Sequence, residues 1–302
     1  MSDADIVVIG SYNTDVILSV AHLPAAGETC LGLARNEAAG GKGSNQAVQA
    51  ARCGARTAFI GAIGDDGPGA KALEMWAKAG VAADPVVRLT DHPTGMAIIL
   101  VAADGENCIV VESGANAHLS VAHAQAAAPA IRGARVVLAQ LETPPAATRA
   151  AFEIARAQGV TTALNAAPAP EHVDEALLSL TDLLFVNEGE AAALTGLAEV
   201  EAAAQALLQR VAVGVVVTLG GAGAILFRRD AAPLRQPAMA VEVVDTTGAG
   251  DAFIGAFAAR LAATGRLDEA MSWGVTAGAL ACTKLGATPS YADGEEIARR
   301  LG

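Results

Sequence analysis

Residues 241–257 read VEVVDTTGAGDAFIGAF, and this stretch decides the fold. Its Val-rich residues 241–244 lead into a loop with two glycines, and an apolar run at helical spacing follows, which predicts a strand, a tight turn and a helix. Gly248 and Gly250 allow backbone N–H groups to turn toward one point, where the unpaired N–H groups of the first helical turn also point. The stretch therefore predicts an anion-binding site at the start of a helix.

Asp251 places a carboxylate where the helix would otherwise receive the anion. The positive end of the helix dipole favours its ionised form, so it can accept a proton beside a negative charge that the same N–H groups stabilise. A hydroxyl that attacks a phosphoryl group needs this combination. An Asp at a helix start is more often a simple cap. A cap would need neither the two glycines nor Asp245, so we favour a catalytic base.

The composition limits the class of protein. With 302 residues, 53% of them hydrophobic, and a positive mean hydropathy, the chain can bury a large core. Its formal net charge of −12, without a cluster of Lys or Arg, argues against nucleic acid and against a membrane surface as partners. The four cysteines form no C-x-x-C motif, which favours reduced thiols in a cytoplasmic protein. Acids near the N-terminus, at residues 3 and 5, predict no targeting segment.

Short apolar strands alternate with Ala-rich helical stretches along the chain, which predicts an α/β protein with a doubly wound, mostly parallel sheet flanked by helices. The predicted buried strands are 6–9, 57–60, 136–138, 161–164, 183–186 and 215–219. The uncharged run 211–227 contains four glycines, Gly214, Gly220, Gly221 and Gly223, so it predicts a strand, a glycine turn and a strand instead of a membrane span.

Two stretches break this rhythm. Residues 16–37 lack the helical pattern, and residues 96–101 and 107–112 form a predicted hairpin around Asp104-Gly105. We expect both to form a small β-sheet inserted into the larger domain. Because no internal repeat or charged linker is present, residues 1–302 are expected to fold as a single domain.

A second glycine motif, AGGKGSNQA at residues 39–47, also precedes a helical stretch. The ammonium group of Lys42 and the amide of Asn45 can hydrogen-bond a polyhydroxylated ligand. A Walker A loop is excluded, because position 36 is Asn and position 43 is Gly. A plain glycine turn with an exposed Lys explains this motif equally well when it is considered alone.

Further polar residues follow the predicted strands, at the edge where open α/β sheets bind ligands. Asn13 and Asp15 follow the first strand, and Glu142 follows the strand near Leu141. Asn187, Glu190 and the turn Thr218-Leu219-Gly220-Gly221-Ala222-Gly223 follow later strands, and they suit Mg²⁺ and a nucleotide. Each residue alone is an ordinary turn or surface residue; together they predict a nucleotide site beside Asp251.

These motifs resemble those of the ribokinase-like, or phosphofructokinase-B, carbohydrate kinase family over nearly the whole chain. Residues 245–251, DTTGAGD, resemble the second signature of the family, and residues 40–54 resemble the first. The segments SYNTD (11–15), PAAGET (24–29), GANA (114–117) and NAAPA (165–169) extend the resemblance. The inserted sheet, roughly residues 14–38 and 94–113, would be a lid over the sugar, and pairing of its outward face with a second subunit implies a homodimer.

The resemblance also implies roles for individual residues. The sugar would be bound by Asn13, Asp15, Gly41, Lys42, Asn45, Glu142 and Asp251. Asp251 would be the base and Ala249 to Asp251 the anion hole, with Gly248, Ala249 and Gly250 counted beside Asp251 as catalytic residues. ATP would contact Asn187, Thr218, Leu219, Gly220, Gly221, Ala222, Gly223 and Gly250, with Asn187 and Glu190 near Mg²⁺.

One carboxylate, Asp245, together with carbonyl oxygens from the loop 281–290 suits a large monovalent cation better than Mg²⁺. By resemblance the K⁺ ligands would be Asp245, the carbonyls of Thr247, Ala281, Lys284 and Gly286, and Ser290. The alternative is that Asp245 only caps its own turn.

The activity implied is that of a phosphotransferase, which moves the γ-phosphate of ATP to the 5-hydroxyl of D-ribose and gives D-ribose 5-phosphate. A related kinase for deoxyribose, another sugar or a nucleoside is the alternative. A sugar sensor without catalysis is a further alternative, but the intact Asp251 and its two glycines argue against it.

Overall fold

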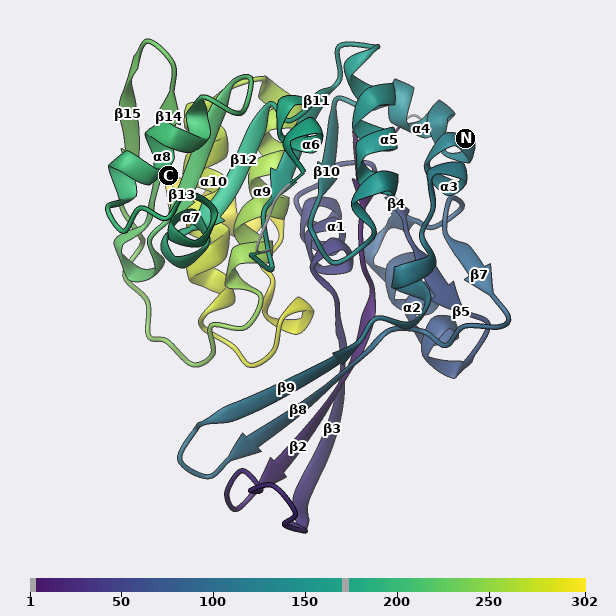
Figure 1. The fold of residues 1–302 in the computed structure, drawn as a ribbon. Coiled ribbons are helices and arrows are strands. Elements are labelled where there is room, and N and C mark those ends of the chain that lie inside the picture. The colour runs from purple at the N-terminus through teal and green to yellow at the C-terminus, as the bar shows by residue number, and fades with distance from the viewer. Residues whose placement is uncertain (1–3, 170–173) are drawn as a thin grey trace.

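The computed structural model describes residues 4–169 and 174–302, so the acidic N-terminal residues 1–3 lie outside the described part. A nine-stranded sheet forms the centre, in the order β15-β14-β13-β12-β11-β10-β1-β4-β6 (Figure 1). The strands are β1 Ile6–Ile9, β4 Thr57–Ile60, β6 Val81–Ala82, β10 Val136–Ala139, β11 Thr161–Asn165, β12 Leu183–Asn187, β13 Gly214–Thr218, β14 Ala224–Arg228 and β15 Ala231–Gln236. All six predicted buried strands are present and pair in parallel, which confirms the predicted fold class.

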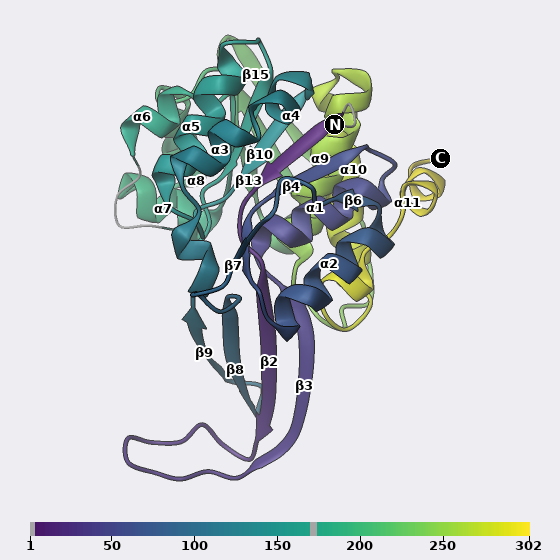
Figure 2. The ribbon, with the colours of Figure 1, turned by 90° about the vertical axis from the view of Figure 1, so that its right-hand side faces the viewer.

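Helices cover both faces of this sheet, because alternate residues of each strand enter different cores. In β1, Val7 and Ile9 join one core while Ile6 and Val8 join the other. One face carries α3 Val121–Ala126, α4 Ala128–Gly133, α5 Pro145–Arg156, α6 Glu175–Ser179, α7 Glu188–Thr195 and α8 Val200–Leu208. The other carries α1 Lys42–Arg52, α2 Gly67–Ala79, α9 Ala249–Thr264 and α10 Leu267–Ala281, with α11 Gly294–Leu301 outside them (Figure 2).

A separate four-stranded sheet projects from this body (Figures 1 and 2). Its order is β3-β2-β8-β9, with β2 Asn13–Val20, β3 Gly32–Gly40, β8 Met96–Ala102 and β9 Asn107–Glu112. The predicted hairpin is therefore present, and it pairs in parallel with β2. Two short strands, β5 Ala62–Gly64 and β7 Val87–Leu89, and the 3-10 turns η1 Gly114–His118, η2 Gly220–Ala222 and η3 Thr288–Ser290 complete the elements.

The predicted strand at residues 241–244 is wrong. The segment is a loop, with Val243 and Val244 62% and 54% exposed. The last strand of the sheet before this segment, β15, ends at Gln236, and residues 237–244 form no strand. Backbone N–H groups of Val244 and Asp245 instead donate to the carbonyl of Cys282. These two bonds hold the segment that leads into α9, without pairing to a strand.

The run 211–227 folds as predicted, with β13 turning through η2 into the antiparallel β14. In the part of the chain that the structure describes, no single helix has the length and apolar composition to cross a membrane, and one bent pair, α7 with α8, meets that test only jointly.

Candidate active site

The polar residues that follow β1, β10, β12 and β13 meet at the carboxyl edge of the sheet, together with the first turns of α1 and α9. A central cavity of about 160 Å³ brings together the predicted residues Lys42, Asn187, Glu190, Thr218, Gly248, Gly250 and Asp251. These residues come from four separate stretches of the sequence. The predicted clustering at one sheet edge is therefore present in the structure.

The two glycines at the start of α9 have different structural roles. Gly248 is the N-cap residue with φ 73°, and a Cβ there would lie 2.6 Å from the Tyr291 hydroxyl and 2.7 Å from Ala287 Cβ. A Cβ on Gly250 would meet no atom within 4 Å, and Gly250 lines the central cavity. Gly248 is thus required by the turn, whereas Gly250 leaves space for a ligand to approach the backbone.

Asp251 lies in the first turn of α9 and is only 8% exposed. Its Oδ2 accepts a hydrogen bond from Asn45 Nδ2 at 3.0 Å, and its Oδ1 accepts one from Gln46 Nε2 at 2.9 Å. Burial raises the pKa of this carboxyl, whereas the positive charge of Lys42 and the two amide hydrogen bonds oppose the rise. The result is a carboxylate with raised proton affinity that faces a cavity.

A second cavity of about 390 Å³, the lid-side cavity, is lined by Asn13, Val111, Ser113, Asn116 and Glu142, among others. Glu142 accepts hydrogen bonds from the Ser11 hydroxyl and from the Lys42 N–H, the latter at 2.9 Å. Asn13 Oδ1 accepts one from Asn116 Nδ2 at 2.9 Å. Lys42 lines the central cavity, so its hydrogen bond to Glu142 joins the walls of the two cavities.

Asp15 faces the same side of the projecting sheet as Val111, because both pair with Ala97. Burial, with a smaller repulsion from Glu142, raises its pKa to about 6. Asp15 is therefore a largely buried acid on the same face of the sheet as Val111, which lines the lid-side cavity. The structure brings the remaining predicted sugar residues close as well, since Gly41 is the N-cap of α1 and Asn45 lies in its first turn.

A third cavity of about 250 Å³, the glycine-turn cavity, borders the central one through Thr218 and Gly250. Its walls are the turn residues Gly220, Gly221 and Gly223 and the apolar residues Met239, Val243, Phe253 and Val275, among others. A flat heterocycle suits such an apolar slot. Leu219 and Ala222 belong to the predicted turn, but Leu219 packs against the main core, and neither lines this cavity among the described residues.

Asn187 and Glu190 form a capping box at the start of α7. Asn187 Oδ1 accepts the Glu190 N–H at 2.7 Å, and Glu190 Oε2 accepts the Asn187 N–H at 2.8 Å. Both also line the central cavity, so they act as a helix cap and still face the ligand space. Burial, more than any other cause, raises the pKa of Glu190. Among the described residues, no protein group donates to its Oε1, which leaves one oxygen for a cation.

The loops 245–248 and 282–290 lie together. Asp245 Oδ1 accepts the N–H and hydroxyl of Thr247 at 2.9 and 2.7 Å, and its Oδ2 accepts the Gly286 N–H at 2.8 Å. Asp245 thus caps its own turn and also joins the second loop. The Ser290 hydroxyl donates to Ala287 within its own loop.

Several residues at the site were missed as functional candidates. Gln46 contacts Asp251, Gln140 contacts Gln46, and the Tyr291 hydroxyl donates to the Gly248 carbonyl at 3.1 Å. Gln46 directly follows Asn45 in the glycine motif, a signal that could have suggested it. Gln140 and Tyr291 carry no such signal, because only the folded chain brings them to the site.

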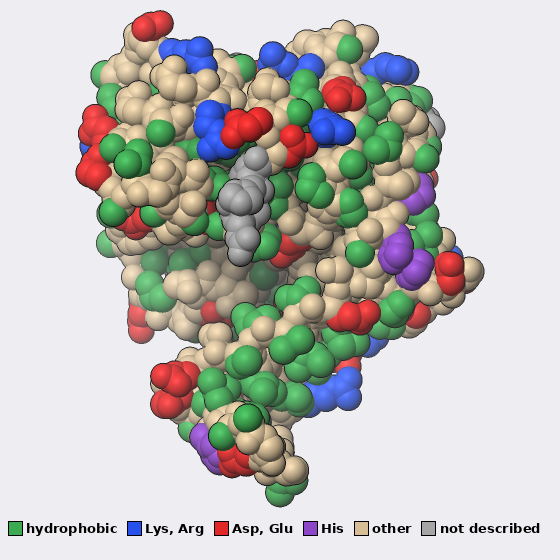
Figure 3. All heavy atoms as spheres, viewed as in Figure 1, with side chains coloured by type: hydrophobic (Ala, Val, Ile, Leu, Met, Phe, Trp, Pro, Cys, Tyr) green, Lys and Arg blue, Asp and Glu red, His purple; other side chains and the backbone are tan. Residues whose placement is uncertain are grey.

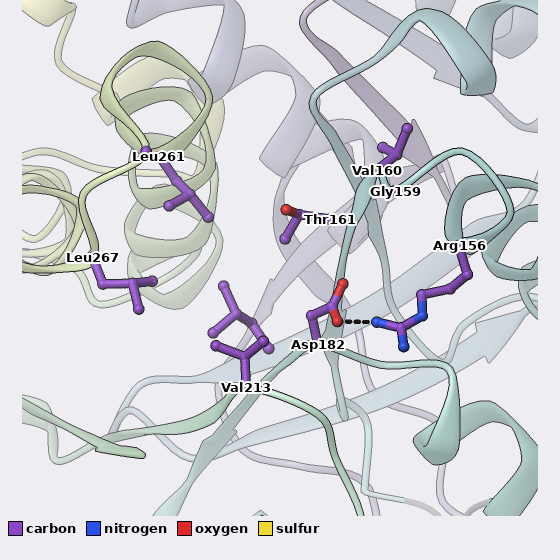
Figure 4. Close-up of a pocket in the computed structure, with 10 residues that line it drawn as sticks. Arg156, Gly159, Val160, Thr161, Asp182, Val213, Leu261 and Leu267 are labelled. Atoms are coloured by element: carbon purple, nitrogen blue, oxygen red, sulfur yellow. Dashed lines mark hydrogen bonds and ion pairs between the residues drawn. The ribbon is translucent and has the colours of Figure 1, made fainter. Parts of the chain in front are cut away.

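A larger cavity, of about 520 Å³, lies at the opposite edge of the sheet, near the amino ends of β11 and β12 (Figure 4). Its charged residues, Arg156 and Asp182, form an ion pair with each other. Asp182 also accepts hydrogen bonds from the N–H and hydroxyl of Thr162, so its carboxylate is satisfied internally. Nothing in this cavity requires a ligand, and none of the predicted site residues lines it.

Comparison with known proteins identifies the family of this chain. The chain matches the pfkB family carbohydrate kinase over residues 3–293. It is 39% identical to the ribokinase of Haemophilus influenzae over 294 residues, 96% of this chain and 95% of that protein. It is 34% identical to the deoxyribokinase of Salmonella typhi over 301 residues, 97% of each chain. A solved structure of Arabidopsis thaliana ribokinase complexed with ribose and ATP is similar with a TM-score of 0.94 and 31% identity, covering 99% of this chain and 98% of that one. This chain therefore belongs to the pfkB family of carbohydrate kinases.

Proposed function

We propose that the enzyme transfers the γ-phosphate of ATP to the 5-hydroxyl of D-ribose and releases ADP and D-ribose 5-phosphate. The observation that carries this proposal is the position of Asp251, a buried carboxylate at a helix N-terminus. Its cavity shares Thr218 and Gly250 with the glycine-turn cavity and is joined to the lid-side cavity by the hydrogen bond from Lys42 to Glu142. The chain resembles ribokinases over nearly its whole length, so ribose is the first substrate to test.

The reaction follows from this geometry. Asp251 accepts the proton of the sugar hydroxyl, whose oxygen then attacks the γ-phosphorus while the bond to the β-phosphate oxygen breaks. The backbone N–H groups of Gly248, Gly250 and Asp251 stabilise the charge on the transferred phosphoryl group. The N–H group of Ala249, which the anion hole was also expected to include, donates to the carbonyl of Thr246 at 3.2 Å in this structure. Gly250 leaves this approach open, because nothing occupies the space where its Cβ would lie.

The sugar occupies the lid-side cavity in this proposal. Asn13, Asp15, Lys42, Asn45 and Glu142 offer carboxylate, amide and ammonium groups for its hydroxyls, and Gly41 permits close approach of the backbone. The lid, roughly residues 14–38 and 94–113 of a single domain, closes over this cavity and excludes water that would otherwise be phosphorylated.

ATP occupies the glycine-turn cavity, with its base among the apolar walls and its phosphates toward Gly250 and Asn187. The residues Thr218, Leu219, Gly220, Gly221, Ala222 and Gly223 supply the turn along which the nucleotide lies. Glu190 and Asn187 fit Mg²⁺, since both line the central cavity and, among residues 4–169 and 174–302, no group donates to Oε1 of Glu190. Mg²⁺ bound there would neutralise part of the negative charge on the ATP phosphates.

A K⁺ activator fits the paired loops beside the anion hole. In the part of the chain that the structure describes, no hydrogen bond ends on the backbone carbonyls of Thr247, Lys284 and Gly286. These carbonyls, with Asp245, Ala281 and Ser290, would hold the cation, whose charge would steady the loop that precedes α9.

The lid also offers a surface for a second subunit. Its outward face carries Val16, Ile98 and Val110 in one cross-strand row, with Leu100 and Cys108 in the next. Ile98 and Val110 are 41% and 62% exposed, and hydrophobic side chains gather over the projecting sheet in Figure 3. We propose a homodimer through this face. The free cysteines and the acidic charge also agree with a cytoplasmic location.

The test is ADP release by the purified protein with a panel of ribose, deoxyribose, hexoses and nucleosides. Ribose should give the highest kcat/KM. Deoxyribose is the second candidate, because a deoxyribokinase is 34% identical over 97% of the chain. Higher kcat/KM with deoxyribose would replace ribose in the proposal, and no turnover with any compound would favour a sugar sensor.

A further inference from the structure

A chain of buried amide side chains stands behind Asp251. Gln140 Nε2 donates to Gln46 Oε1 at 2.6 Å, and Gln46 Nε2 donates to Asp251 Oδ1 at 2.9 Å. Gln46 is 0% exposed and Gln140 is 1% exposed. They come from α1 and from the end of β10, so two separate elements fix the orientation of one amide.

This arrangement determines which side of the Gln46 amide faces the carboxylate. Its oxygen is occupied by Gln140, and its NH₂ group donates both to Asp251 and to Asn165 Oδ1 at 3.2 Å. Gln46 can therefore donate to Asp251 but cannot accept from it. An ionised carboxylate only accepts hydrogen bonds, whereas a protonated one needs an acceptor for its own hydrogen. The amide chain thus matches the ionised form of Asp251.

We propose that Gln46 is a positioning residue, which fixes the orientation of the Asp251 carboxylate and favours its ionised form, and that Gln140 holds the Gln46 amide in the donating orientation. The inference rests on the proposed function for its effect on turnover. Its effect on Asp251 itself does not depend on which substrate is used.

Other charged groups also act on Asp251. Lys42 from α1 favours the ionised form, whereas Glu142, which follows β10, and Glu190 from α7 disfavour it. Tyr291, buried near the start of α9, stays neutral because burial raises its pKa well above its ordinary value. All four remain when Gln46 is replaced, so a change in Asp251 reports the loss of the amide hydrogen bond.

The decisive variant is Gln46→Met, which keeps an unbranched side chain of similar length but removes the donor. Gln49→Met is its matched control. Gln49 lies in the same helix, is also 0% exposed, and donates to the carbonyl of Ala292 at 2.9 Å. Both variants lose one buried amide, but only Gln46→Met loses the bond to Asp251.

The first readout needs no turnover. The carboxyl ¹³C resonance of Asp251, assigned by its absence in Asp251→Asn, is titrated by NMR without sugar or nucleotide. Its midpoint should rise by about one pH unit in Gln46→Met, because a hydrogen bond to a charged acceptor is lost. Gln49→Met should titrate like the wild type. Gln140→Met should shift the midpoint in the same direction by a smaller amount, and it serves as the test if Gln46→Met does not fold.

The second readout is kinetic. In Gln46→Met the acid limb of kcat should move to higher pH, with kcat on that limb falling about tenfold and the KM values for sugar and ATP changing less than about twofold. Equal NMR midpoints in the wild type and Gln46→Met, or an equal shift in Gln49→Met, would overturn the inference. A shifted midpoint in a protein that phosphorylates nothing in the panel would overturn the proposed function alone.

Discussion

Gly286 donates its backbone N–H to Asp245 Oδ2 at 2.8 Å, and this bond joins two loops that are 41 positions apart in the sequence. Burial of Asp245 works against its charge, but the hydrogen bonds from Thr247 and Gly286 outweigh it and lower its pKa. An ionised carboxylate therefore lies directly before the proposed anion hole. Whatever fixes the 282–290 loop also fixes the start of α9.

This relationship predicts activation by K⁺. In buffer free of sodium and potassium, added KCl should raise kcat several-fold with little change in the sugar KM, because the cation would order N–H groups that act in the transition state. The measurement is ADP release across a KCl titration, with tetramethylammonium chloride as the ionic-strength control. KCl should also raise the melting temperature of the wild type and leave that of Asp245→Ala unchanged. Equal responses to both salts would exclude the site.

Asp251→Asn should abolish most turnover while sugar binding persists. The change keeps the size of the side chain but removes the base, so kcat should fall about 10²- to 10⁴-fold. Calorimetry of ribose binding to the variant separates this loss from unfolding, and Asp182→Asn, at the opposite edge of the sheet, controls for loss of a buried carboxylate. A variant with nearly normal kcat would remove Asp251 from the mechanism.

Asp15→Asn should weaken sugar binding while stabilising the sugar-free protein. Loss of the charged acceptor should raise the ribose KM about 10- to 100-fold, with the ATP KM nearly constant. The pKa of Asp15 is about 6 in the folded state and 3.8 for an ordinary Asp, so between pH 3.8 and pH 6 the folded protein holds this proton more tightly than the unfolded chain. Above pH 6 the Asp15 carboxylate is ionised in both states, and its burial then lowers the stability of the folded protein.

The stability gain of Asp15→Asn should therefore be greatest above pH 6 and vanish toward pH 4. Melting temperatures of both proteins from pH 4 to 8 measure it. A gain that grows on acidification would contradict the raised pKa of Asp15.

Val110→Glu should prevent dimer formation, because it places a charge in the apolar outward face of the lid. Val213→Glu is the control, since Val213 is 40% exposed on the main body, away from the lid. Sedimentation velocity should give a dimer for the wild type and Val213→Glu and a monomer for Val110→Glu. A monomeric wild type would rule out the proposed dimer.

The main sheet could be predicted because its parallel strands are buried on both faces. Strands such as residues 183–186 and 215–219 are continuous apolar runs between turn residues, a pattern that depends on local sequence alone. Residues 241–244 have a similar Val-rich composition, but they form a loop, and the N–H groups of Val244 and Asp245 bond to the carbonyl of Cys282 instead of to a strand. Strand pairing is a property of the whole fold, and local composition does not report it.

The candidate site likewise contains residues that the local sequence predicts and contacts that only the folded chain creates. Asn13, Glu142 and Thr218 were predictable because each follows a strand, and parallel strands end at one edge. The contacts of Gln46 with Gln140 and of Tyr291 with Gly248 join residues 94 and 43 positions apart. No spacing rule links such pairs, since their proximity depends on how helices pack on the sheet.

Strand β2 begins at Asn13 and also carries Asp15, so two of the groups proposed to hold the sugar belong to the same sheet that is proposed to act as the lid. Any movement of the lid would therefore change the contacts with the sugar at the same time. If the lid opens as proposed, it would withdraw the hydrogen bonds of Asn13 and Asp15 from the product, so the exit would open and product binding would weaken in the same movement. A substitution that stiffens β2 at its junction with the main body would consequently slow product departure as well as lid opening.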